Sequence, residues 1–370
     1  MEQAPWYQIS NIDQLDSPAL VVYPFRVKQN IDRLLAYVDD VNRLRPHIKT
    51  HKSPDATQLL LQAGVRKFKC ATIAEAEMLA QAGAPDVLLA YQPVGAKMGR
   101  LIALIKHYPA TTFSCLVDNA DTARQLSAEA VSAGVTIPVY IDLNVGMNRT
   151  GIAPDASVLA LYDELARLDG LRPVGLHAYD GHIRNPDMTA RTEQCDTAFL
   201  PVTQLRDQLR EKGYEPIIVA GGSPTFPIHS QRPDVECSPG TFIYWDNGYQ
   251  TTLAEQPFRP AALVIGRVIS QLDATKLCID IGHKSIAAES DLAHRITFLN
   301  APDLQPIGQS EEHLVVEAGE GHAYRVGDVL YGLPHHICPT CALYERAYTV
   351  NQGLVSGEWR TVARDRTLIY

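Results

Sequence analysis

The chain has 370 residues, 20% charged and 46% hydrophobic, which is the balance of an ordinary globular protein and at this length predicts two domains. Its formal net charge of −9, with no run of lysine or arginine, argues against a partner such as nucleic acid or an anionic membrane. Seven scattered cysteines predict free thiols and a cytoplasmic protein, and no segment resembles a signal peptide or reaches the roughly 18 apolar residues of a membrane span.

After an N-terminal segment, residues 1–25, apolar β-branched runs alternate with stretches of helical periodicity over residues 26–250. Eight such runs end at Lys49, Thr72, Tyr91, Val117, Asn144, Gly181, Gly222 and Phe242. Strands that alternate with helices of this length are typical of parallel β/α units. The sequence therefore predicts an α/β fold in which a TIM-type (β/α)8 barrel occupies residues 26–250.

Beyond residue 250 the helical periodicity is almost lost. Short alternating runs follow one another, separated by Gly, Pro and Asp turns. This pattern predicts a C-terminal antiparallel β domain over residues 251–370. The N-terminal segment, residues 1–25, contains the apolar run PALVVYPF and could pack on this domain.

In a barrel of this kind the active site lies at the C-terminal ends of the strands. Lys49 ends the first run, inside the polar stretch RPHIKTHKS. A lysine amine that projects into a barrel mouth can form a Schiff base with an aldehyde. The alternative is an ordinary solvated lysine, since most lysines are exposed.

Two glycine-containing turns follow the seventh and eighth runs, Gly221-Gly222-Ser223 and Gly240-Thr241. Glycines let the backbone approach an anion closely, and these two loops are the usual phosphate site of such barrels. Opposite a Schiff-base lysine, the two turns predict a site for pyridoxal 5′-phosphate (PLP).

Two further side chains lie at predicted strand ends near this site, Arg149 in LNVGMNRTG and Tyr179 in HAYDGH. Either could approach the pyridine nitrogen of the cofactor or a substrate carboxylate. An arginine beside that nitrogen would keep it unprotonated, because a second positive charge nearby is costly.

The segment LPHHICPTCALYE carries His336 and Cys338, which in an extended segment would lie on one face. A His/Cys pair suits zinc, and two protein ligands leave open positions, as a catalytic metal requires. A redox C-x-x-C of Cys338 and Cys341, a structural zinc site and buried thiols without a role are the alternatives.

Several motifs, in this order and spacing, resemble the D-threonine aldolase and D-serine dehydratase-like family of alanine racemase-type (fold type III) PLP enzymes. They are RPHIKTHKS, CATIAEAEML, LNVGMNRTG, YDGH, AGGSPT, SPGTFIYWD and PHHICPT. The resemblance implies a PLP barrel, a C-terminal β domain and a homodimer. It implies that Lys49 holds the cofactor as an aldimine, with Arg149 and Tyr179 beside the ring.

The same resemblance implies roles for the remaining candidates. Gly221, Gly222, Ser223, Gly240 and Thr241 would surround the phosphate, His47 would lie near the substrate, and His336 and Cys338 would bind a divalent metal. Aldolase-like members tend to have Asp at the position of Cys338, and dehydratase-like members have Cys and use zinc.

The sequence thus favours a PLP- and zinc-dependent lyase that dehydrates D-3-hydroxy amino acids such as D-serine or D-threonine. Retro-aldol cleavage to glycine and an aldehyde is the alternative within the family. A racemase would need a second acid–base group, for which Tyr244, Tyr331 or Tyr344 could serve. A non-enzymatic PLP carrier is disfavoured by residues 251–370, and a barrel that binds another phosphate compound stays possible.

Overall fold

The computed structural model describes residues 5–370, which divide into two compact units. The first, here called the barrel unit, comprises Leu34–Lys49, Thr57–Gly240 and Asp365–Tyr370. The second, here called the sheet unit, comprises the described residues up to Arg33 together with Thr50–Ala56 and Thr241–Arg364. Among residues 5–370, no helix is both long enough and apolar enough to cross a membrane.

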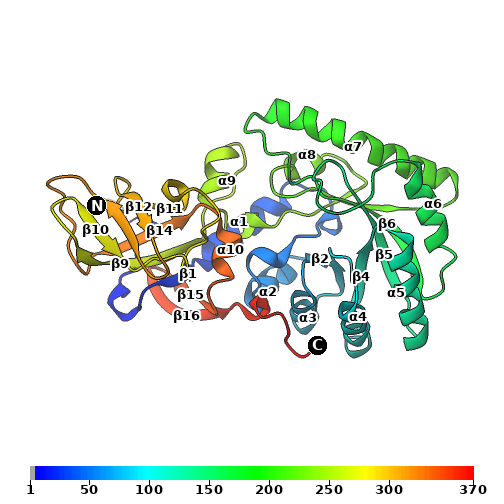
Figure 1. The fold of residues 1–370 in the computed structure, drawn as a ribbon, viewed down its shortest axis with the longest axis horizontal. Helices are drawn as coiled ribbons and strands as arrows, with labels where there is room; N and C mark the ends of the chain where they lie inside the picture. The colour runs from blue at the N-terminus through cyan, green and yellow to red at the C-terminus, as the bar shows by residue number, and fades with distance from the viewer. Residues whose placement is uncertain (1–4) are drawn as a thin grey trace. The chain divides into compact units, whose positions relative to one another are not determined.

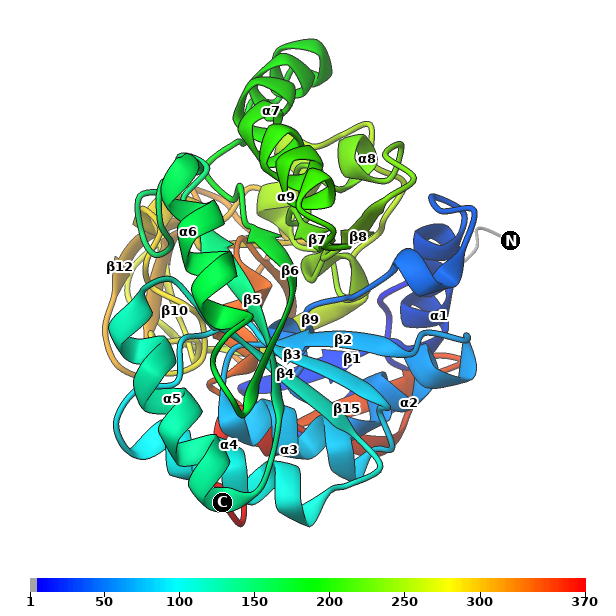
Figure 2. The same cartoon turned by 90° about the vertical axis from the view of Figure 1, so that its right-hand side faces the viewer.

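The barrel unit is built on a parallel sheet of seven strands in sequence order, which confirms the predicted α/β class. The strands are β2 (Lys67–Cys70), β3 (Asp86–Leu89), β4 (Thr112–Val117), β5 (Ile137–Leu143), β6 (Leu171–Ala178), β7 (Ile217–Ala220) and β8 (Val235–Cys237). The helices between them are α3 (Ile73–Gln81), α4 (Ala96–His107), α5 (Ala120–Ala133), α6 (Ala156–Leu165), α7 (Met188–Glu211) and α8 (Phe226–His229), and α2 (Pro54–Gln62) precedes β2. Figure 2 shows α3 to α6 along the outside of the strands.

The predicted first strand is an irregular extended segment rather than a regular strand. Leu44 forms a parallel bridge with Cys237 of β8, and His47 forms one with Lys69 of β2, so this segment joins the two edges of the sheet. Pro46 interrupts the ladder because it has no N–H to donate, although its carbonyl accepts from the Lys69 N–H at 2.9 Å. Lys49 therefore lies one turn beyond this segment, in the 3-10 turn Ile48–Thr50.

The interior of the barrel is filled below the strand ends. Arg45 is 1% exposed, and its guanidinium lies 2.7 Å from Glu236 and 2.6 Å from Asp86. An apolar cluster of Leu88, Leu116, Tyr140 and Val219 lies in the same sheet. Paired charges and apolar side chains thus close the barrel, and ligands can enter only at its ends.

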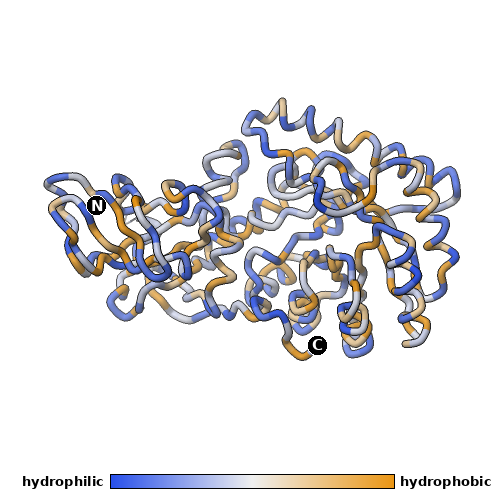
Figure 3. Tube along the Cα trace, viewed as in Figure 1, coloured by the Kyte–Doolittle hydropathy of each residue, from blue (hydrophilic) through white to orange (hydrophobic). Residues whose placement is uncertain are grey.

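The helices of the barrel unit begin at side-chain caps. The Thr72, Asn119 and Asp187 side chains each accept a backbone N–H in the first turn of α3, α5 and α7. These contacts satisfy donors that have no partner within the helix. In Figure 3 the tube through α7 alternates between hydrophilic and hydrophobic colours, as expected for a helix with one buried face.

The sheet unit contains one nine-stranded sheet (Figure 1). Its strands are β1 (Ala19–Val22), β9 (Ala262–Gln271), β10 (Lys276–Ile279), β11 (Ile296–Phe298), β12 (Gln305–Gln309), β13 (Leu314–Glu317), β14 (Val329–Pro334), β15 (Arg346–Asn351) and β16 (Leu354–Arg360). Three further helices are α1 (Pro24–Leu35), α9 (Asn247–Thr252) and α10 (Ile337–Cys341). β1 pairs antiparallel with β9 and parallel with β15, so the sheet is mostly antiparallel.

Candidate active site

A cavity of about 520 Å³ opens at the C-terminal ends of the strands in the barrel unit. His47, Lys49, Arg149 and Tyr179, which the sequence predicts as site residues, all line it. The structure therefore brings together side chains from three separate stretches of the chain, around Lys49, Arg149 and Tyr179. Concave sites at this end of a barrel are where ligands of such folds bind.

The backbone around each of these side chains is held by local hydrogen bonds. The Lys49 N–H donates to Nδ1 of His47 at 3.3 Å, which orients the turn that carries the lysine. The loop that carries Arg149 folds back on itself, because the Asn144 side chain accepts the Asn148 N–H at 3.0 Å. The lysine and the arginine are thus presented by short turns that the strand ends position.

Three cationic groups surround the ring of Tyr179. The guanidinium of Arg149 lies 4.9 Å from the ring centroid, and the amines of Lys69 and Lys49 lie 5.7 and 6.0 Å from it. Cations at such distances are attracted by the ring quadrupole. Their convergence also makes this part of the cavity suited to an anionic group.

Lys69 is a cavity residue that the sequence reasoning did not single out. It is 2% exposed, and burial together with the nearby charge of Lys49 lowers its pKa to about 7. The alternation Lys67-Phe68-Lys69 in β2 was the available signal. In a strand, side chains two apart share a face, so both lysines lie on the face opposite Phe68, and in this barrel that face points inward.

His177 and Asp142 form a buried pair in the wall of the cavity, with Nδ1 of His177 2.7 Å from the Asp142 carboxylate. Burial lowers the pKa of His177, and Asp142 opposes this only in part. Nε2 of His177 is buried and has no hydrogen-bond partner among the described residues. A buried donor or acceptor without a partner is costly, so this atom favours a bound ligand in the cavity.

The two glycine-containing turns meet, as the sequence predicts, since the Gly240 N–H donates to the Ser223 hydroxyl at 3.3 Å. A side chain at Gly222 would lie 3.1 Å from the Tyr179 ring. The glycine N–H groups are not free, however. Gly221 donates to the Ala178 carbonyl at 3.1 Å and Gly222 to the Thr225 hydroxyl at 3.3 Å. The turn thus lets an anion approach its backbone closely, but Gly221 and Gly222 have no free N–H group to donate to it.

His336 and Cys338 lie in the sheet unit at the start of α10, not in an extended segment. His336 precedes the helix and Cys338 is its second residue. The helix forms here because the Asp246 carboxylate accepts the Ile337 N–H at 3.1 Å and caps it. The two candidate ligands still meet. Burial alone would lower the pKa of His336, but its hydrogen bond with Cys338 raises it to about 9.

The thiol of Cys338 has two hydroxyl neighbours within the sheet unit. Thr50 Oγ1 lies 3.1 Å and Thr241 Oγ1 lies 3.6 Å from its Sγ. Thr241, predicted as a phosphate contact, therefore has a hydroxyl beside the candidate metal ligand. Hydroxyl donors around a sulfur stabilise its thiolate form, which is the form that binds metals.

The three tyrosines considered for a racemase lie in the sheet unit, where Tyr244 and Tyr331 are buried and Tyr344 is partly buried. Tyr331 accepts the Ile9 N–H at 3.2 Å, and Tyr344 donates to the Ser285 carbonyl at 2.8 Å. Burial raises the pKa of all three phenols, including Tyr244. A raised pKa keeps these phenols protonated at neutral pH.

Comparisons with known proteins agree with this architecture. The family described as "Alanine racemase, N-terminal domain" matches residues 24–248, more than half of the chain, and the "Putative serine dehydratase domain" matches residues 261–350. D-threonine aldolase of Arthrobacter sp. is 30% identical over 95% of this chain and 93% of its own length. D-threo-3-hydroxyaspartate dehydratase of Delftia sp. (strain HT23) is 25% identical over 89% of this chain and 93% of its own length.

A solved structure shows the same relationship in three dimensions. The crystal structure of D-threonine aldolase from Filomicrobium marinum superimposes with a TM-score of 0.87 at 26% identity, covering 96% of this chain and 98% of that protein. The chain therefore belongs to the alanine racemase-type PLP enzymes, in the family of D-threonine aldolases and D-serine dehydratase-like proteins, and it is a PLP-dependent lyase.

Proposed function

We propose that this protein is a PLP- and divalent-metal-dependent lyase that acts on D-3-hydroxy amino acids, with Lys49 as the residue that binds the cofactor. The observation that carries the proposal is the single cavity shared by Lys49, Arg149, Tyr179 and His177 at the strand ends. The family's named members act on substrates of this class.

The residues of the barrel unit fit PLP. The Lys49 amine lines the cavity and can bond an aldehyde, and Nε2 of His177 is a buried polar atom that needs a partner. The turn at Gly221, Gly222 and Ser223, joined to Gly240, has no side chain in its first two residues that would keep a phosphate away. When bound, PLP supplies an electron sink for charge that develops at the substrate's α-carbon.

The protein's own groups then have separate tasks. The Lys49 amine would be the group that takes the α-proton of the substrate. Arg149 holds positive charge beside the Tyr179 ring, and His47, which accepts the Lys49 N–H and lines the same cavity, would contact the substrate. Asp142 holds His177 by Nδ1, which leaves Nε2 available to a bound ligand.

His336 and Cys338 are the proposed ligands of the divalent metal, and their nitrogen and sulfur donors favour zinc. The ion would supply Lewis-acid assistance to the β-hydroxyl of the substrate. Thr50 and Thr241 support this assignment because their hydroxyls lie beside the Cys338 sulfur. Thr50 also follows Lys49 directly in the chain.

We propose dehydration as the reaction, giving a 2-oxo acid and ammonia, because Cys338 is the softer ligand that marks dehydratase-like members. Retro-aldol cleavage is the second candidate, since the relative with 30% identity is a D-threonine aldolase. We also propose that the enzyme is a homodimer, which light scattering of the purified protein would test.

The deciding experiment is proton NMR of D-threonine incubated with the protein, PLP and zinc, with an EDTA-treated sample beside it. Formation of 2-oxobutanoate establishes dehydration, whereas glycine with acetaldehyde establishes aldol cleavage. Lys49→Ala should abolish either reaction. Cys338→Ala should abolish turnover while the matched variant Cys278→Ala, another sheet-unit thiol, retains it. Full activity of Cys338→Ala after chelation would rule out the proposed metal site.

A further inference from the structure

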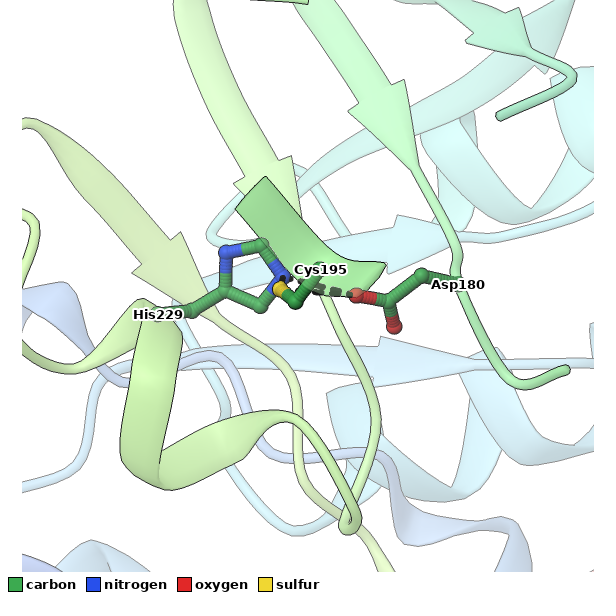
Figure 4. Close-up of side chains that lie close together, drawn as sticks. All are labelled: Asp180, Cys195 and His229. Atoms are coloured by element: carbon green, nitrogen blue, oxygen red, sulfur yellow. Dashed lines mark hydrogen bonds and ion pairs between the residues drawn. The ribbon is translucent and has the colours of Figure 1, made fainter. Parts of the chain in front are cut away.

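A chain of buried polar groups lies behind the Gly221–Gly222 turn in the barrel unit. Asp180 directly follows Tyr179, and its carboxylate lies 2.8 Å from Nε2 of His229, at the end of α8 (Figure 4). The other oxygen of Asp180 accepts the Thr225 hydroxyl at 2.7 Å. Asp180, His229 and Thr225 are at most 4% exposed.

This chain of contacts ends on the turn itself. Because Thr225 gives its proton to Asp180, its oxygen is free to accept the Gly222 N–H at 3.3 Å. A side chain at Gly221 would lie 2.7 Å from the His229 ring, so the imidazole packs directly against the turn. Gly221 also has a φ of +79°, which glycine adopts readily and which residues with a Cβ rarely adopt.

The tautomer of the imidazole follows from its neighbours. Arg232 donates to Nδ1 of His229, so the ring proton is on Nε2 and points at Asp180. Burial alone would raise the pKa of Asp180, but His229 and Thr225 lower it. The carboxylate is therefore ionised and can hold both neighbours in place.

Asp180 and His229 are also two of the three possible metal ligands in the one such cluster found among residues 5–370, with Cys195 as the third (Figure 4). The guanidinium of Arg232 lies 3.7 Å from the Cys195 sulfur and contacts His229 as well. A fixed positive charge on two of three ligands opposes a cation, and burial raises the pKa of the Cys195 thiol to about 12.

We propose that Asp180 is a positioning residue for the phosphate end of the cofactor site, acting through Thr225 and His229 on the Gly221–Ser223 turn. The inference rests on the proposed function, because it requires PLP in this cavity. Asp180 follows Tyr179 in the sequence, so the residue whose ring lies beside Gly222 and the residue that supports the turn are adjacent. Neither Asp180 nor Thr225 is required to touch the substrate.

The test measures binding of PLP and of pyridoxal, which lacks the phosphate, to the cofactor-free full chain by visible absorption. Thr225→Val keeps the shape of the side chain but removes the hydroxyl. It should weaken PLP binding about tenfold, the effect of one buried hydrogen bond, and leave pyridoxal binding unchanged. Thr225→Ser restores the hydroxyl and should restore PLP binding. Asp180→Asn should give the same selective loss.

The outcomes separate the two proposals. If the unaltered protein binds no PLP, the proposed function fails. If it binds PLP but Thr225→Val binds PLP equally well, or loses PLP and pyridoxal to the same extent, the positioning role is wrong. If Asp180→Asn does not fold, the Thr225→Val and Thr225→Ser pair still decides. A stoichiometric zinc ion bound by the protein and lost in Cys195→Ala would show a metal site instead and overturn the proposal.

Discussion

The buried amine of Lys69 should make the stability of the protein depend on pH in a way that one substitution removes. Its pKa falls from 10.5 in an unfolded chain to about 7 in the fold. At roughly 1.4 kcal/mol per pH unit, this difference is worth about 5 kcal/mol. Below pH 7 the amine is charged in both states, and the folded protein bears the full cost of burying the charge.

The sign follows from proton counting. Between pH 7 and pH 10.5 the unfolded chain still holds this proton and the folded protein has lost it. Stability contributed by this group therefore rises with pH across that window. Lys69→Met has no such proton, so from pH 7 to pH 9 the unaltered protein should gain about 2 kcal/mol relative to the variant.

Urea unfolding of the cofactor-free protein at several pH values measures this difference. Lys69→Arg is the matched control, because arginine stays charged throughout the range and keeps the burial cost at every pH. Lys69→Met should therefore be more stable than Lys69→Arg by several kcal/mol at all pH values, which is the cost of burying an unpaired charge. The reasoning is refuted if the difference in free energy of unfolding between the unaltered protein and Lys69→Met stays constant from pH 7 to pH 9.

Three further predictions concern other parts of the two units. Glu236→Gln should lower the free energy of unfolding by about 3 kcal/mol, because the buried guanidinium of Arg45 loses one of its two charged partners. Asp39→Asn, at an exposed carboxylate, should cost under about 1 kcal/mol in the same urea assay. Gly221→Ala should lower the free energy of unfolding by more than about 2 kcal/mol, because the added Cβ clashes with its neighbours at a φ of +79°. Calorimetry should show a smaller loss of stability for Gly83→Ala, because Gly83 has a φ of +86° but open space around it. Cys338→Ala should lose stoichiometric zinc by elemental analysis while its cofactor absorption band is retained, and zinc retained in full would contradict the ligand assignment.

Much of the barrel was predictable because its signals are local. Apolar runs that alternate with helical periodicity require parallel β/α units, and the polar residues at the run ends, such as Lys49 and Tyr179, then have to meet at one end. The cap at Asn119 is likewise a contact within one helical turn. The resemblance to a known family rests on motifs of this kind.

The groups that the sequence did not reveal depend on neighbours far along the chain. His229 carries no local signal, and its partner Asp180 lies 49 residues before it. The unusual environment of Lys69 arises because β2 points that side chain into a closed interior. The sequence predicted the irregular closing segment at Pro46 only in part, because a proline can end a strand as readily as interrupt it.

The sequence by itself determined the order of the elements and the chemical types at the strand ends, since these follow from periodicity and residue chemistry. Only the tertiary structure decided that the glycine N–H groups already have partners, which lysine is buried beside Lys49, and which carboxylate accepts the Thr225 hydroxyl. Protonation, desolvation and hydrogen-bond direction depend on the atoms around a group in space, and that arrangement exists only once the strands have closed.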